Sequence, residues 1–123
     1  MRHLEDHLHK LINGFIQQAI FYKRTKLLTW TYNASGEKRD LRTGALLKAK
    51  GLLKGLPDFE CRYLEDDVVH HIYFEVKVGK NKQSLEQITF ANTCKDSKNN
   101  HYYLVYSLEE VIEALEKKKV LNL

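Results

Sequence analysis

The chain of 123 residues is long enough to bury a core without disulfides or metals as staples, and we expect one domain over residues 1–123. Its composition, 43% hydrophobic and 29% charged, excludes an intrinsically disordered chain, and the net charge of +4 permits a polyanionic partner without requiring one. The charged N-terminus and the lack of a membrane-length apolar run argue against a signal peptide and a membrane span. We therefore expect a soluble cytoplasmic protein.

The first predicted element is a helix over Arg2–Tyr22, because apolar residues recur there at helical spacing. They form one stripe: Leu4, Leu8, Leu11, Ile12, Phe15, Ile16, Ala19 and Ile20. Glu5 lies on the flank of this stripe, so it can reach inward as well as outward. A strand rich in β-branched and aromatic residues is predicted at Leu27–Tyr32, then a polar loop and a short helix at Thr43–Lys50.

The second half of the chain alternates strands and helices. We predict strands at Asp58–Tyr63 and Val69–Val78, a helix at Ser84–Lys95, a strand at His101–Tyr106 and a helix at Ser107–Lys119. Both late helices open with capping-box patterns, "SLEQ" and "SLEE". The order α-β-α-β-β-α-β-α predicts an α/β fold, a mixed β-sheet with helices on both faces.

Charged residues stand inside the two central strands. Side chains alternate along a strand, so Glu75 and Lys77 share one face of Val69–Val78. If the two strands pair as a hairpin, Asp58 and Glu75 converge near one end of the sheet. Two carboxylates and a lysine suit Mg²⁺-dependent phosphodiester hydrolysis, because Mg²⁺ prefers oxygen ligands. The alternative is a Glu–Lys salt bridge at a wet edge.

Basic residues are clustered on both sides of this constellation. The segment between Glu37 and Lys54 holds Lys38, Arg39, Arg42, Lys48, Lys50 and Lys54, and a second cluster comprises Lys77, Lys80 and Lys82. Such clusters favour nucleic acid as a partner, although a solvated surface also explains them. The histidines and the two cysteines, Cys61 and Cys94, lack zinc-site spacing, and the cysteines are expected to be buried and reduced.

Three short motifs, "GLPDF", "YFEVK" and "SLEQ", occur in an order that resembles the PD-(D/E)xK nucleases, and more narrowly the VRR-NUC family. The upstream segment from "NASGEKRD" through "LKAKG" is similar to small stand-alone, phage-type members, so the resemblance covers about Glu5 to Leu115. It implies a restriction-endonuclease-like fold and metal-dependent cleavage of DNA, often of branched or flapped structures such as Holliday junctions.

The resemblance also assigns roles by position. It implies that Asp58 and Glu75 are metal ligands together with the carbonyl of Val76, and that Lys77 is the catalytic lysine. Gln87 matches the motif glutamine that reaches the active site, yet as the third residue after Ser84 it also fits a helix cap.

On the first helix, Glu5 matches the acidic residue that the family aims at the metal, and His9 stands where the family often has glutamine. Glu60 shares a strand face with Asp58 but matches no motif.

We predict a Mg²⁺- or Mn²⁺-dependent DNA endonuclease that forms a homodimer, because one domain of this size offers little surface for a branched substrate. The residues expected to contact the nucleic acid are Asn33, Lys38, Arg39, Lys48, Lys54 and Lys80. The alternatives are a DNA-binding module that keeps the nuclease fold without catalysis, and an RNA nuclease.

Overall fold

The computed structural model describes residues 2–33, 45–46, 50–51 and 54–122. The elements along these residues are α1 (Arg2–Phe21), β1 (Thr29–Tyr32), β2 (Phe59–Glu65), β3 (Val68–Val76), α3 (Leu85–Lys95), β4 (Asn100–Val105) and α4 (Leu108–Lys117). The predicted helix Thr43–Lys50 falls mostly outside the described residues.

The four strands form one mixed sheet in the order β1-β2-β3-β4. β1 and β3 both run antiparallel to β2, whereas β3 and β4 are parallel. A two-residue turn at Asp66 and Asp67 joins β2 to β3, and both residues have the positive φ that matches the twist of a hairpin. α3 supplies the crossover that a parallel pair requires. The predicted hairpin and the mixed α/β sheet are therefore confirmed.

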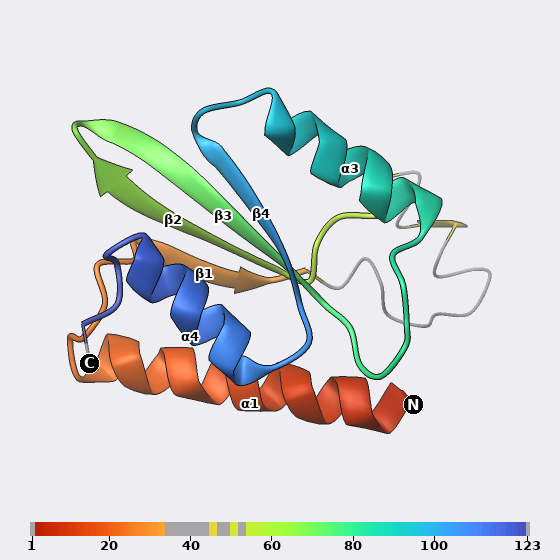
Figure 1. Cartoon of the computed structure of the whole chain (residues 1–123), viewed down its shortest axis with the longest axis horizontal. Coiled ribbons are helices and arrows are strands. Elements are labelled where there is room, and N and C mark those ends of the chain that lie inside the picture. The colour runs from red at the N-terminus through yellow and green to blue at the C-terminus, as the bar shows by residue number, and fades with distance from the viewer. Residues whose placement is uncertain (1, 34–44, 47–49, 52–53, 123) are drawn as a thin grey trace.

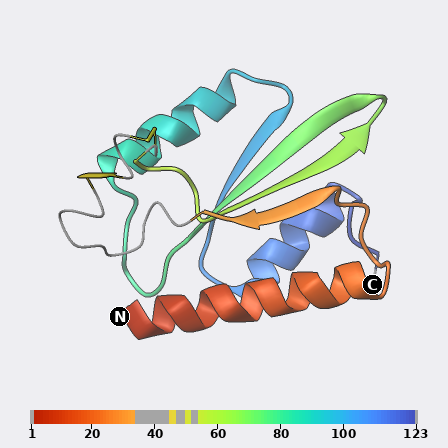
Figure 2. The ribbon, with the colours of Figure 1, turned by 180° about the vertical axis from the view of Figure 1, so that it is seen from behind.

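Helices cover both faces of the sheet. α1 and α4 pack on one face and α3 lies on the other, as the two opposite views show (Figure 1 and Figure 2). The core between the sheet, α1 and α4 includes Ile12, Ile16, Phe59, Cys61, Ile72, Phe74, Val76, Val111 and Leu115. On the opposite face, Phe90 of α3 contacts Tyr73 edge-on at 5.0 Å between ring centroids.

The apolar stripe predicted on α1 is wider than the face that α1 buries. Ile12, Ile16 and Ala19 are buried, but Leu4, Leu11 and Ile20 stay between 41% and 48% exposed. The sequence periodicity placed all of these residues in one stripe, whereas the sheet and α4 cover only the part centred on Ile12 and Ile16.

The predicted caps of the two late helices differ in outcome. In α3 the capping box is complete: the Ser84 hydroxyl accepts from the Gln87 N–H, and the Gln87 side chain accepts from the Ser84 N–H. In α4, Ser107 caps the Glu110 N–H, but the Glu110 carboxylate accepts from the Tyr106 N–H instead. The predicted second capping box is therefore incomplete, because Glu110 bonds the residue before the cap instead of Ser107 itself.

The cysteines are buried and free, as expected. Among the described residues, no helix has the length and apolar character needed to cross a membrane.

Candidate metal-binding site

Asp58 and Glu75 are the two charged residues that are buried in the described part of the chain, with 7% and 1% of their surface exposed. Asp58 directly precedes β2, and Glu75 lies one residue before the end of β3. Because Phe59 pairs with Phe74, the antiparallel register brings Asp58 beside Glu75. The predicted convergence of the two carboxylates is therefore present in the structure.

The position of Asp58 is fixed by hydrogen bonds from two strands. Its Oδ2 accepts from the backbone N–H of Val76 at 2.7 Å, and its carbonyl accepts from the backbone N–H of Asn33 at 2.7 Å. The Asn33 side-chain amide donates to the carbonyl of Pro57 at 2.9 Å. Asn33 thus holds the Pro57–Asp58 segment in place, and the contact with DNA assigned to it stays a prediction.

One oxygen of the Glu75 carboxyl group contacts both Lys77 and Gln87. Its Oε2 accepts from Gln87 Nε2 at 3.1 Å and lies 3.7 Å from the Lys77 ammonium. The side chains of Glu75 and Lys77 are 2% and 14% exposed, so this pair is not a wet edge contact. Gln87 makes two contacts at once, because its Oε1 caps α3 while its Nε2 donates to Glu75, and its role in an active site stays a prediction.

The second oxygen of Glu75 bears on the protonation state of the site. Oε1 is buried and receives no hydrogen bond from an N–H group of the described residues. Burial, the charge of Asp58 and a side-chain hydrogen bond with Asp58 raise the pKa of Glu75 to about 9, against the opposing effect of Lys77. Below this pKa the carboxyl group carries a proton, and a cation bound between the carboxylates would replace it.

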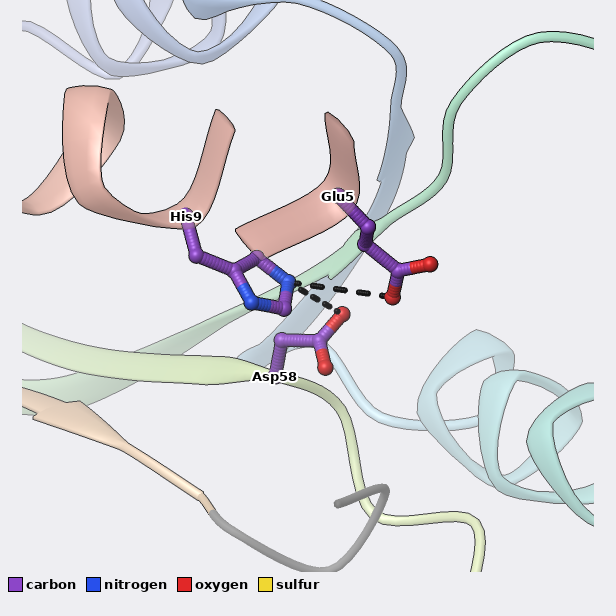
Figure 3. Close-up of side chains that lie close together, drawn as sticks. All are labelled: Glu5, His9 and Asp58. Carbon is purple, nitrogen blue, oxygen red and sulfur yellow. Dashed lines mark ion pairs between the residues drawn. The ribbon is translucent and has the colours of Figure 1, made fainter. Parts of the chain in front are cut away.

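Helix α1 adds two residues to the site. His9 Nε2 lies 3.5 Å from Asp58 Oδ2 and 3.9 Å from Glu5 Oε1, as drawn in Figure 3. One ligand atom from each of Glu5, His9 and Asp58 lies within 4.8 Å of the others, which is close enough to hold one metal ion. Glu75 adjoins this group through Asp58. The inward position predicted for Glu5 is present, and His9 is a site residue that sequence reasoning did not assign.

The histidine is held by the surrounding negative charge. Burial opposes its protonation, but the hydrogen bond and charge of Asp58, with the charges of Glu5 and Asp6, outweigh burial and raise the pKa of His9. Its Nε2 is buried, with Asp58 Oδ2 at 3.5 Å. The i, i+4 spacing of Glu5 and His9 makes them neighbours on α1, and it is the sequence signal that could have drawn attention to His9.

Only some of the residues predicted to contact nucleic acid lie in the described part of the chain. Lys38, Arg39 and Lys48 lie outside the described residues. Lys54 is highly exposed and its ammonium lies 3.4 Å from the Glu86 carboxylate, while Lys80 is exposed. Both lysines flank the segments that carry Asp58 and Gln87, and their contact with DNA remains a prediction.

Comparison of the chain with protein-family models, with curated proteins and with solved structures finds no match.

Proposed function

We propose that this protein is a divalent-metal-dependent nuclease that hydrolyses phosphodiester bonds in DNA. The observation that carries the proposal is the pair of buried carboxylates, Asp58 and Glu75, with Lys77 and Gln87 both directed at Glu75. Removing two carboxyl groups from water is costly, and one lysine does not offset the cost. Such an arrangement is typical of a functional site.

The side chains present fit a divalent cation. Glu75 Oε1 and His9 Nε2 are buried, and both groups adjoin the Asp58 carboxylate. Asp58, Glu75 and Glu5 offer hard oxygen ligands of the kind that Mg²⁺ and Mn²⁺ bind, and the carbonyl of Val76 completes the proposed set. The imidazole of His9 would favour Mn²⁺ over Mg²⁺. When bound, such an ion acidifies a water molecule and offsets charge on the phosphoryl oxygens.

The surrounding side chains would position and stabilise the reacting groups. The Lys77 ammonium favours the ionised form of Glu75 and places positive charge where negative charge develops on the phosphate. The Gln87 amide donates to Glu75 Oε2, which leaves Oε1 outside this hydrogen bond. His9 keeps Asp58 close to α1 and so draws Glu5 into the same group.

The fold and the order of the motifs support a restriction-endonuclease-like nuclease of the VRR-NUC type. The hairpin β2–β3 carries the "PD" and "E-V-K" residues, α3 follows with Gln87, and β4 returns parallel to β3. This arrangement agrees with the resemblance of "GLPDF", "YFEVK" and "SLEQ" to that family.

Cleavage of linear, flapped and four-way-junction DNA tests the proposal, measured with Mg²⁺, with Mn²⁺ and with EDTA. We expect cleavage that requires the metal and that falls about 100-fold or more in Asp58→Asn and in Lys77→Ala. Asp58→Asn retains an oxygen that can accept from the Val76 N–H, so the fold is preserved. Glu60→Gln is the matched control, because Glu60 lies on β2 but contacts Arg62 and His71 instead of the site.

Unchanged cleavage by Asp58→Asn and Lys77→Ala would refute the site assignment. Salt-sensitive DNA binding with no cleavage under any metal would show the alternative, a DNA-binding module on a nuclease fold. Competition with RNA substrates of the same shape decides between a DNA and an RNA nuclease.

A further inference from the structure

A cavity of about 450 Å³ lies at the end of the sheet away from Asp58. It is separated from Asp58 by the length of β2, roughly 20 Å at the rise of a strand. Its walls come from the hairpin end of β2 and β3, from the start of β4, and from the segments that follow α1 and α4. The lining residues are Lys26, Tyr63, Leu64, Glu65, His70, His101, Lys117, Lys118, Lys119 and Val120.

The cavity carries an excess of positive charge. Four lysines line it against a single acidic residue, Glu65. Among the described residues, no carboxylate lies within ion-pair distance of any of these lysines. Glu65 therefore offsets only part of the positive charge of the four lysines, and the remaining excess favours an anion.

A chain of hydrogen bonds orients the polar groups of one wall. The Lys118 ammonium lies 3.1 Å from His101 Nδ1, and His101 Nε2 lies 3.1 Å from His70 Nδ1. An ammonium group only donates, so His101 accepts at Nδ1 and donates from Nε2 to His70. Burial and the nearby Lys118 lower the pKa of His101, which keeps this ring neutral. These hydrogen bonds therefore link Lys118, His101 and His70 in a row along this wall.

The conformation of the chain at the end of α4 sets the position of Lys119 at the cavity. The end of α4 is a Schellman motif, in which the Lys119 N–H bonds the Glu116 carbonyl and the Val120 N–H bonds the Leu115 carbonyl. Lys119 occupies the left-handed position of this motif, with φ of 61°, where glycine is the favoured residue. The chain thus places a strained lysine at the rim of the cavity at a cost in stability.

We propose that this cavity binds a phosphate-bearing ligand. Several lysines converging on one hollow are suited to a group with more than one negative charge, and lysine binds phosphate as a point charge. A volume of about 450 Å³ accommodates a nucleotide-sized molecule as well as a terminal phosphate of a nucleic acid. The ligand is recognised through its phosphate in either case. This inference is independent of the metal site and of the proposed nuclease activity.

Calorimetric titration with inorganic pyrophosphate tests the proposal, in 150 mM sodium chloride and EDTA so that the metal site does not contribute. The decisive variant is Lys119→Gly, which removes the charge while relieving the backbone strain, so the protein should gain thermal stability yet lose affinity. The matched control is Lys23→Gly, because Lys23 has φ of 57° at the same position of a Schellman motif after α1 and does not line the cavity. Lys26→Met removes the charge that the segment after α1 contributes to the cavity, and so tests whether this wall also binds the phosphate.

We expect wild-type protein and Lys23→Gly to bind pyrophosphate equally, and Lys119→Gly and Lys26→Met to bind about tenfold or more weakly. A second pair of probes, an oligothymidylate with a 5′-phosphate and one with a 5′-hydroxyl group, identifies the source of the phosphate. A 5′-phosphate preference that Lys119→Gly abolishes indicates a nucleic-acid end, and a response to pyrophosphate alone indicates a free ligand. The proposal is overturned if wild-type protein binds none of these probes, if Lys119→Gly binds like wild type, or if Lys23→Gly loses the same affinity.

Discussion

Glu75 is the residue whose protonation couples the candidate site to stability. In the metal-free protein its pKa is raised to about 9, whereas in the unfolded chain it returns to its usual value of 4.5. Between these values the folded state holds a proton that the unfolded state has lost. The free energy of unfolding therefore falls as the pH rises, by up to about 1.4 kcal/mol per pH unit.

We expect Glu75→Gln to remove this pH dependence, since the amide is neutral throughout. Urea unfolding at pH 6, 7 and 8 in EDTA measures the effect, and the variant should gain stability over wild type as the pH increases. Glu60→Gln, a change to a partly exposed carboxylate on the neighbouring strand, should follow wild type. Parallel curves for wild type and Glu75→Gln would contradict the raised pKa.

Gln87 connects a helix cap to the candidate site, and two substitutions separate these functions. Ser84→Ala removes the hydroxyl that caps the Gln87 N–H and should cost about 1 kcal/mol, yet it leaves the amide on Glu75. Gln87→Glu retains an acceptor for the Ser84 N–H but cannot donate to Glu75. We expect cleavage to survive in Ser84→Ala and to fall sharply in Gln87→Glu, with unfolding curves recorded in parallel. Equal cleavage by both variants would show that Gln87 acts only as a helix cap.

Much of the candidate site could be predicted from sequence because strand periodicity alone places Glu75 and Lys77 on one side. The contribution of α1 could not be predicted in the same way. A helical pattern shows that Glu5 and His9 are neighbours, but only the packing of α1 against the sheet decides that both turn towards Asp58. The structural role of Asn33 could not be predicted for a similar reason: its amide donates to the carbonyl of Pro57, a partner 24 residues away, whereas its predicted contact with DNA stays a prediction.

At the scale of elements, Gly55 controls how the segment before β2 meets α3. It has φ of 88°, and a Cβ at this position would lie 2.7 Å from the backbone of Glu86 in the first turn of α3. Nearby, the Lys54 ammonium lies 3.4 Å from the Glu86 carboxylate. The Asp58 segment and the helix that presents Gln87 are therefore in direct contact, and the site depends on this contact.

Gly55→Ala should consequently separate Asp58 from Gln87. We expect a loss of stability of about 2 kcal/mol or more, from the strained φ and the steric overlap together, and weaker Mn²⁺ binding by calorimetry. Gly51→Ala is the matched control, because Gly51 has φ of 100° with open space around its Cβ position. It should show only the smaller cost of the positive φ, with Mn²⁺ affinity unchanged. Equal effects of the two substitutions would rule out the close contact as the cause.

The elements themselves were predictable wherever local signals and tertiary packing agree. The two antiparallel strands with "LEDD" between them were found because turn residues and alternation coincide there. The predicted start of a strand differs from the observed one where a tertiary hydrogen bond sets the conformation. The sequence predicts a strand from Asp58, but β2 begins at Phe59, and the Asp58 carboxylate accepts from the Val76 N–H. The sheet order also depended on non-local pairing, which no segment specifies alone.

For the whole molecule, the sheet separates two regions of different charge. Three carboxyl groups, those of Glu5, Asp58 and Glu75, gather near the C-terminal end of β3. The lysine-lined cavity lies at the opposite end, where β3 begins. The proposed cation site and the proposed anion site are thus held apart by the length of β2 and β3, so we expect that each can be altered by mutation without disturbing the other.

The outer surface of α1 provides the argument for a dimer. Leu4 and Leu11 are 48% and 47% exposed, and with the half-buried Phe15 they are spaced at i, i+7 and i+11; Tyr22, which is 62% exposed, directly follows the end of α1. Positions with this spacing lie along one line of a helix, beside the face that α1 turns to the core. An exposed apolar line of this length is typical of a surface that a second helix covers.

We expect two copies to pair through this line of α1, which is the homodimer that the sequence also predicts. Sedimentation equilibrium should give twice the 14.5 kDa mass of the chain, and Leu11→Glu should give the monomer mass because it places a charge in the centre of the interface. Ile20→Glu is the matched control: Ile20 is 41% exposed but lies on the opposite flank of α1, about 160° from Leu4 around the helix. A monomeric wild type would refute the interface, and loss of the dimer in Ile20→Glu alone would move it to the other flank. If the monomeric variant still cleaves linear DNA but not four-way junctions, the pairing of two sites determines the choice of substrate.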